Sequence, residues 1–360
     1  MTPRVFGLPP GVDFPKALVS GLIAKHSGQP PEALARVELI VNTRRMARRI
    51  RDLFDAGPPL LLPRIRLVTD LADTVDLATI PPAISPLRRR LELVQLIGIL
   101  LDQQPDLAPR TSLYDLADSL AALMDEMHGE GVSPKAIEAL DVSDQSGHWE
   151  RAKVFIGIVQ RYFETSQEAP DKEARQRQVI KALAERWQIS PPQNPIIIAG
   201  STGSRGATML LMQAVAKLQQ GALVLPGYDF DLPLPVWSKL DEALLSEDHP
   251  QFRFRKLMHQ LGINPDDVQN WDPAIHPASP SRGRLVSLSL RPAPVTDAWL
   301  VEGPHLGDLK EATKDLTLIE AHDPRDEALA IATRLRQAVE NKQTAALITP
   351  DRMLSRRVSA

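Results

Sequence analysis

The amino-acid sequence predicts an α/β fold in which a parallel β-sheet is interrupted by a block of helices. Short aliphatic or β-branched runs recur, and each is followed by a polar turn and a segment with helical spacing of apolar residues. Between residues 85 and 190 only the helical spacing is found. Alternating strands and helices are typical of a parallel sheet covered by helices, so we interpret the block as an insertion into such a sheet.

The length of 360 residues suggests about two domains. We expect a first α/β domain over 1–240 with its helical insertion at about 85–190, a Pro- and Ser-rich irregular connection over 241–313, and the beginning of a second α/β domain over 314–360. The strands predicted in the first domain are 37–41, 64–68, 195–199 and 222–225. Its helices are predicted at 44–54, 87–101, 112–127, 148–163 and 171–187, with a further helix from the turn at 200–207 through 217, and the connection has one helix near 252–261.

The last part of the sequence predicts a strand at 316–320, a helix from Pro324 to about Glu340 with Asp323 as its N-cap, a strand at 345–349 and a helix from Arg352. Segment 346–358 also repeats segment 38–50, with five identical residues in equivalent positions. A duplicated α/β domain explains the repeat, and chance is the alternative. Because so short a segment cannot bury both faces of a sheet, we expect the sequence to be the N-terminal part of a longer protein.

Composition excludes several classes of site. The sequence has no cysteine, which excludes disulfides, thiolate metal sites and a cysteine nucleophile, and fits a cytoplasmic location. It has no signal peptide, and no apolar stretch is long enough for a transmembrane helix. The net charge of −3 gives no overall attraction to nucleic acid, so any polyanion site has to be local.

The most basic segment follows the strand predicted at 37–41. It comprises Asn42, Thr43, Arg44, Arg45 and Arg48, and helical spacing places Arg44, Arg48 and Arg51 on one face. Its arginines could contact phosphates at the end of the strand, or they could simply be a solvated helix face. For a second basic run, residues 88–90, the solvated face is the preferred interpretation.

A glycine-rich turn follows the strand predicted at 195–199. In the turn, 200–207, glycines permit close approach of an anion to the backbone and to the following helix N-terminus, and Ser201, Thr202, Ser204 and Arg205 add donors. The alternative is an ordinary tight turn between strand and helix. Neither this turn nor segment 7–16 contains G-x-x-x-x-G-K-[ST], so ATP hydrolysis by this chain alone is not expected.

Other candidate sites are weaker. Asp229 and Asp231 could bind a divalent metal, but no third ligand is apparent and a loop with Asx turns is the preferred interpretation. The histidines do not have metal-ligand spacing, and no G-x-S-x-G context surrounds Ser201. We therefore predict no catalytic residue, no metal and no cofactor in this chain.

Four segments of the sequence resemble the AddB family, the second subunit of AddAB helicase–nucleases that process double-strand DNA breaks, in its alphaproteobacterial form. They are GLPPGVDFPKALVSGL at 7–22, ELIVNTRRMARRIRDLF at 38–54, PIIIAGSTGSRGATMLLMQAVAKLQQGALVLPGYDFDLP at 195–233 and AALITPDRMLSRRV at 345–358. Full-length members are much longer than this chain. The resemblance implies a superfamily-1 helicase-like layout with two RecA-like domains, the first interrupted by a helical insertion.

The resemblance also implies roles for particular residues. Asn42, Thr43, Arg44 and Arg45 match a motif that contacts single-stranded DNA, and residues 349–352, which include Thr349 and Arg352, match its counterpart in the second domain. Segment 7–16 takes the place of the ATP loop without its Gly-Lys-Ser/Thr. ATP-driven translocation would then rest with the AddA partner, and the nuclease domain with its Mg²⁺ and its cysteine-bound iron–sulfur cluster would lie outside this chain.

We therefore expect a DNA-binding, motor-inactive, helicase-like part of a break-repair subunit. Its partners would be AddA, in a heterodimer, and single-stranded or forked DNA at double-strand ends. Arg44, Arg45 and Arg205 are the strongest candidates for phosphate contacts. A structural scaffold that binds only AddA through the helical insertion is the alternative, and residual nucleotide binding at 7–16 is a third hypothesis. Whether this chain is itself an enzyme stays open: the full-length protein resembles a subunit of an ATP-dependent helicase–nuclease, but the chain lacks a Walker A motif and the nuclease domain.

Overall fold

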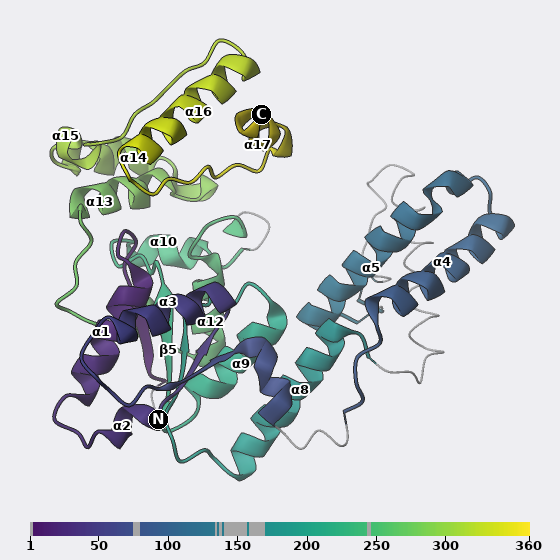
Figure 1. Cartoon of the computed structure of the whole chain (residues 1–360), viewed down its shortest axis with the longest axis horizontal. Coiled ribbons are helices and arrows are strands. Elements are labelled where there is room, and N and C mark those ends of the chain that lie inside the picture. Colours follow the sequence, from purple (N-terminus) through teal and green to yellow (C-terminus); the bar gives the residue numbers. More distant parts are fainter. Residues whose placement is uncertain are drawn as a thin grey trace. The chain divides into compact units, whose positions relative to one another are not determined.

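The first unit of the molecule is organised around a single parallel sheet. The computed structural model describes residues 3–74, 80–133, 135, 136, 139, 157, 170–242 and 246–360 (Figure 1). The sheet has six strands in the order β3-β2-β4-β5-β1-β6, and every pair is parallel. The strands are β1 (Val5–Leu8), β2 (Glu38–Val41), β3 (Arg64–Leu67), β4 (Ile196–Ala199), β5 (Gly221–Pro226) and β6 (Gln269–Asn270). This confirms the predicted α/β fold, and the sheet is consistent with a RecA-like architecture.

Alternation along the strands divides the core into two layers. In β2, Leu39 and Val41 face one side of the sheet and Ile40 faces the other, because successive side chains of a strand point to opposite faces. Helices α1 (Phe14–His26), α2 (Glu32–Ala35) and α3 (Arg44–Asp55) contribute to the layer with Leu39. The other layer contains side chains of α8 (Lys172–Ile189), α9 (Gly206–Ala216), α10 (Leu234–Lys239) and α12 (Phe252–Leu261). Both faces of the sheet are therefore covered, which explains the uninterrupted apolar runs of β4 and β5.

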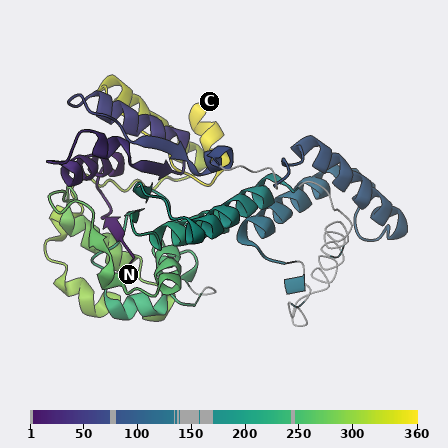
Figure 2. The same ribbon diagram turned by 90° about the horizontal axis from the view of Figure 1, so that it is seen from below.

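The helical insertion is joined to the sheet through α8. Its helices α4 (Pro86–Gln103) and α5 (Leu113–Glu130) pack on each other through Leu93, Ile97, Leu120 and Met124. The beginning of helix α8 lies against α5 (Figure 2). Further along α8, Val179, Ile180 and Leu183 belong to the core of the sheet. Two 3₁₀ helices flank α4, at Val68–Thr74 and Arg110–Ser112. The helix predicted at 148–163 lies outside the described residues.

A buried polar network holds the three helices together. Arg89, which is 7% exposed, contacts carboxylates of Asp125 on α5 and of Asp171, the N-cap of α8. His128 also hydrogen-bonds to Asp171. Burial alone raises the pKa of Asp171, but bonds from His128 and from the Ala174 N–H outweigh that effect, so the pKa lies below its ordinary value. The interpretation of 88–90 as a solvated face is therefore wrong for Arg89, because its charge is satisfied by carboxylates of two other helices.

The connection predicted at 241–313 is more regular than the sequence predicts. Besides the expected α12, it contains α13 (Pro280–Ser289), α14 (Ala298–Glu302), 3₁₀ helices at Pro265–Asp267, Ala293–Val295 and Gly303–His305, and strand β6. Trp271 is 2% exposed and its indole N–H donates to the carbonyl of Leu18, 3.2 Å away. A Cβ on Gly21 would lie 2.2 Å from that indole nitrogen, so only glycine fits there. The connection is thus part of the core built on α1.

The chain divides into two compact units, Met1–Gly307 and Asp308–Ala360. The second unit contains α15 (Leu309–Ala312), α16 (Pro324–Glu340) and α17 (Arg352–Ser359). As predicted, the Asp323 carboxylate caps α16, accepting from the N–H groups of Arg325 at 2.7 Å and Asp326 at 2.9 Å.

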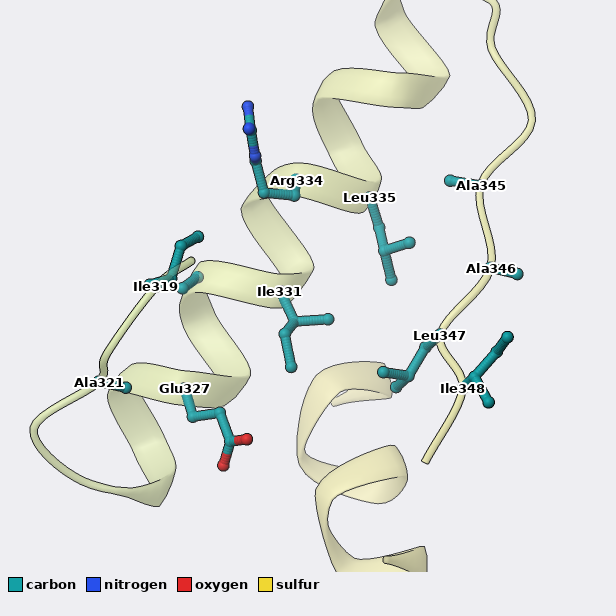
Figure 3. A pocket seen from close by; sticks show the side chains of 11 residues that line it. Ile319, Ala321, Glu327, Ile331, Arg334, Leu335, Ala345, Ala346, Leu347 and Ile348 are labelled. Carbon is teal, nitrogen blue, oxygen red and sulfur yellow. The ribbon is translucent and has the colours of Figure 1, made fainter. Parts of the chain in front are cut away.

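The strands predicted at 316–320 and 345–349 do not form. Both segments are extended, but in this described part of the chain neither has a ladder partner. They border an apolar groove of about 430 Å³ on α16, into which Ile331, Leu335 and Leu347 point (Figure 3). Leu318 and Ile348 remain 86% and 94% exposed. The local sequence favours an extended backbone, but a strand also requires a neighbouring strand.

Candidate nucleic-acid interface

Two loops predicted to carry the site meet at the carboxyl edge of the sheet. Strands β2 and β4 are neighbours, and their register pairs Val41 with Ala199, so both strands end at the same level. The side-chain amide of Asn42 donates to the carbonyl of Gly200 at 3.1 Å. The β2–α3 and β4–α9 loops, far apart in the sequence, are therefore adjacent in the structure.

Helix α3 presents unpaired arginines beside this junction. Thr43 is its N-cap, and the threonine hydroxyl accepts from the N–H of Met46 at 3.1 Å. The apolar face, which includes Ile50, packs on the sheet, while Arg44, Arg45 and Arg48 are exposed. Among the described residues these three arginines have no ion pair or side-chain hydrogen bond.

Two other arginines of α3 already have partners. Arg49 pairs with Asp13 at 3.4 Å, and Arg51 donates to the carbonyl of Ile65 at 3.5 Å. The first of these contacts ties α3 to the beginning of α1. The unpaired positive charge is therefore concentrated on Arg44, Arg45 and Arg48, at and just after the beginning of α3.

The β4–α9 loop packs tightly against the neighbouring helices. Gly200 has φ of 75°, and a Cβ there would lie 2.6 Å from the terminal methyl of Met46 on α3. Ser201 is 5% exposed, and its hydroxyl accepts from the N–H of Gly203 at 3.2 Å, so this serine stabilises the loop. Thr202, Ser204 and Arg205 are exposed.

The N-terminus of α9 is occupied by carboxylates of the insertion. A Glu130 carboxylate oxygen accepts from the N–H of Gly206 at 2.8 Å. Arg205 pairs with Glu173 of α8 at 3.4 Å. A cavity of about 320 Å³ lies here, lined by Asp125, Glu126, Gly129, Glu130, Glu173, Ser204 and Arg205. No local pattern in the sequence indicates these contacts, because Glu130 and Gly206 belong to separate elements.

The β1–α1 loop has a different character. Asp13 caps α1, accepting from the N–H of Lys16 at 3.2 Å, so a carboxylate lies where a nucleotide phosphate would approach the helix. Tyr228 covers the end of β1 so closely that a Cβ on Gly7 would lie 2.7 Å from the tyrosine Cβ. The residues of this loop do not match the donors that a nucleotide phosphate needs.

The loop after β5 forms the predicted Asx turn. A carboxylate oxygen of Asp229 accepts from the N–H of Asp231 at 2.9 Å. Burial and the neighbouring charge of Asp229 raise the pKa of Asp231. In the described part of the chain no group of three or more His, Asp or Glu side chains is arranged to hold a metal ion.

The remaining candidate residues belong to the second unit. The Thr349 hydroxyl accepts from the N–H of Asp351 at 3.0 Å, and the Asp351 carboxylate caps α17 through the N–H of Met353 at 2.7 Å. Arg352 is exposed in the first turn of α17. The arrangement at the start of α17 thus parallels that of Thr43 and Arg44 at the start of α3.

Comparison with known proteins gives no assignment: no protein-family model and no curated protein matches the chain. Within the described ranges, none of the helices has the length and apolar character needed to span a bilayer.

Proposed function

We propose that this chain is the DNA-binding, motor-inactive part of an AddB-type subunit in a helicase–nuclease that processes double-strand breaks. The observation that carries the proposal is the meeting of the Asn42 and Gly200 loops at one sheet edge, next to Arg44, Arg45 and Arg48. The segment resemblance to AddB supplies the identity of the subunit, and a cytoplasmic location agrees with it.

Phosphate is the group that this edge suits best. Unpaired guanidinium groups beside a helix N-terminus favour negative charge, and arginine makes bidentate contacts with phosphate oxygens. Because the whole chain has a net charge of −3, the attraction has to come from this local cluster. Single-stranded or forked DNA, running along the carboxyl edge from α3 to the β4–α9 loop, is the proposed ligand.

Translocation is assigned to the AddA partner. The sequence has no Walker A motif, and the Asp13 carboxylate caps the helix that would otherwise receive the nucleotide phosphates. Residual nucleotide binding at 7–16 is therefore disfavoured. The role of this chain would be to hold a DNA strand near the motor subunit.

The test is fluorescence anisotropy with single-stranded and forked DNA over a salt series, with and without AddA. The chain with Arg44→Ala, Arg45→Ala and Arg205→Ala should bind single-stranded DNA at least about tenfold more weakly at 0.1 M salt. Its salt slope should fall by about 2, since each phosphate contact on a single strand contributes about 0.7 to the slope.

A matched control removes three positive charges from the opposite edge of the sheet. Arg36, Arg186 and Lys217 are exposed and lie at the amino side of β2, β4 and β5. The variant with all three replaced by alanine should keep most of the affinity. Equal losses in the two triple variants would contradict the proposed edge, and absence of salt-dependent binding by the folded chain with AddA would contradict DNA binding altogether.

A scaffold that contacts only AddA is the second candidate, because the insertion exposes apolar side chains. Leu87, Leu91 and Ile99 of α4 are 65%, 54% and 52% exposed, and Leu87 and Leu91 are one helical turn apart. Two results together would favour the scaffold. The complex with AddA forms with the unchanged chain but not with the L87D/L91D variant, and the complex binds DNA no better than AddA alone.

A further inference from the structure

The end of α5 is held directly against the start of α9. The Glu130 carboxylate bonds to the N–H of Gly206 at 2.8 Å. A Cβ on Gly206 would lie 2.7 Å from the Glu130 Cα and 2.7 Å from the Gly129 carbonyl oxygen. Glycine at 206 therefore permits the insertion to approach the loop that carries Arg205.

A second carboxylate of the insertion engages the same loop. Glu173, in the first turn of α8, pairs with Arg205 at 3.4 Å. The Glu173 side chain is 18% exposed, and that of Arg205 is 73% exposed. Arg177 of α8 donates to the Gly129 carbonyl at 3.0 Å, which fixes the end of α5 relative to α8. Both glutamates thus reach the β4–α9 loop from one connected support.

We propose that Glu130 and Glu173 take the positions of DNA phosphates at the β4–α9 loop, so that the insertion and DNA compete for it. The inference rests on the proposed function. Carboxylates and phosphates accept from the same donors, a backbone N–H and a guanidinium. The Gly206 N–H satisfies one of them at a time, and a phosphate at Arg205 repels the carboxylate of Glu173. DNA that binds along the edge displaces the insertion from the loop.

The arginines differ in whether they have an ionic partner, and this difference sets the order in which DNA contacts them. Arg44, Arg45 and Arg48 have no ionic partner in the described chain, whereas Arg205 has Glu173. A DNA strand therefore binds first at α3. The Arg205–Glu173 pair is weak because its guanidinium is open to water, which screens the attraction, and a neighbouring phosphate of the anchored strand then replaces the glutamate. Inorganic phosphate lacks the anchor and does not displace it.

The decisive variant is Glu173→Gln, which leaves the side-chain shape but removes the competing charge. It should bind a single-stranded oligonucleotide about three- to tenfold more tightly than the unchanged chain. Glu130→Gln should also tighten binding, by less, because glutamine still offers a carbonyl oxygen to the Gly206 N–H. In the E173Q/R205A variant the gain should disappear.

Glu126 provides the matched control, since it lines the same cavity and has no ion pair or side-chain hydrogen bond within the described residues. Glu126→Gln removes the same charge from the same place. If E126Q tightens binding as much as E173Q, only long-range charge is at work and the competition is overturned. Another outcome is that E173Q binds DNA no more tightly than the unchanged chain, while the unchanged chain binds and the R44A/R45A/R205A variant does not. This outcome overturns the competition but leaves the proposed function intact. No binding by any variant overturns both.

A distance measurement tests the displacement itself. Because the chain has no cysteine, Q104C beside α4 and K217C after α9 can carry a pair of spin labels. The label-to-label distance distribution should change when a saturating single-stranded oligonucleotide is added, and should stay unchanged with inorganic phosphate. An unchanged distribution at saturating DNA overturns the proposal.

Discussion

Segments 38–50 and 346–358 share identical residues at five positions, but they form different structures. In both, a capped helix follows the extended part: Thr43 caps α3, and Asp351 caps α17. The extended parts differ, because 38–41 is a strand paired on both sides, whereas 345–349 has no ladder partner among the residues that the structure describes. A helix and its cap are encoded locally, whereas a strand depends on residues elsewhere in the chain.

The topology of the first unit shows what the second one lacks. Strands β1 and β2, which are joined by α1, are separated in the sheet by β4 and β5. In the second unit, α16 joins the corresponding extended segments, and the groove of about 430 Å³ lies along it (Figure 3). Among its described residues nothing takes the place of β4 and β5.

Hydrogen exchange should reveal the largest difference between the two segments. Amides of 39–41 should exchange only through extensive unfolding, with opening free energies of about 5 kcal/mol or more, and amides of 346–348 should exchange at nearly the rate of an unfolded chain. Mass spectrometry of peptic fragments measures both in one sample. Strong protection of 346–348 would mean that this segment is paired in solution.

The equivalent isoleucines allow the comparison to be made by mutation. Ile40 is 0% exposed and Ile348 is 94% exposed. Ile40→Ala should lower the free energy of unfolding by about 2–5 kcal/mol, because it leaves a cavity in the sheet core. Ile348→Ala should change it by less than about 0.5 kcal/mol. Urea denaturation followed by circular dichroism checks both, and similar losses would contradict the exposed state of Ile348.

The smallest effect concerns pH. His249, in the first unit, is 8% exposed, and burial lowers its pKa although the charge of Asp229 acts in the opposite direction. In the unfolded chain the pKa of His249 is about 6.5, so below that pH the unfolded chain binds a proton at His249 more readily than the folded one. The stability of the first unit should therefore fall as pH drops through 6.5 toward the folded pKa.

Tryptophan fluorescence isolates this response, because every tryptophan precedes residue 308. The urea midpoint should be lower at pH 5.5 than at pH 7.5, and His249→Gln should reduce that difference. The depressed pKa of Asp171 acts only below about pH 4, outside this window. If the urea midpoint of H249Q changes with pH as much as that of the unchanged chain, the effect belongs to other histidines.

Strands β2, β4 and β5 could be predicted because each is a short, largely apolar run bounded by turn residues, and β3 because its isoleucine and leucine alternate with arginines. The helices of the insertion could be predicted because their apolar spacing is regular. Strand β1, with the sequence VFGL, gives a weak strand signal because it is short and contains a glycine, and the two residues of β6 are defined only by their pairing with Phe6 and Gly7. At the candidate site, the arginines of α3 indicated the β2–α3 loop, and the glycines indicated the β4–α9 loop. The carboxylates of Glu130 and Glu173 could not be predicted, since they reach the loop through tertiary packing alone.

The position of β1 has a consequence for synthesis on the ribosome. Its ladder partner β5 emerges about 215 residues later, and β6 emerges about 260 residues later, directly followed by Trp271, which completes the packing around α1. At rates of about 5–20 residues per second, the apolar face of the first strand and helix waits roughly 10–50 s for its partners. During that interval the nascent chain offers Leu8, Leu18 and Leu22 to solvent, which makes its first thirty residues a natural binding segment for chaperones.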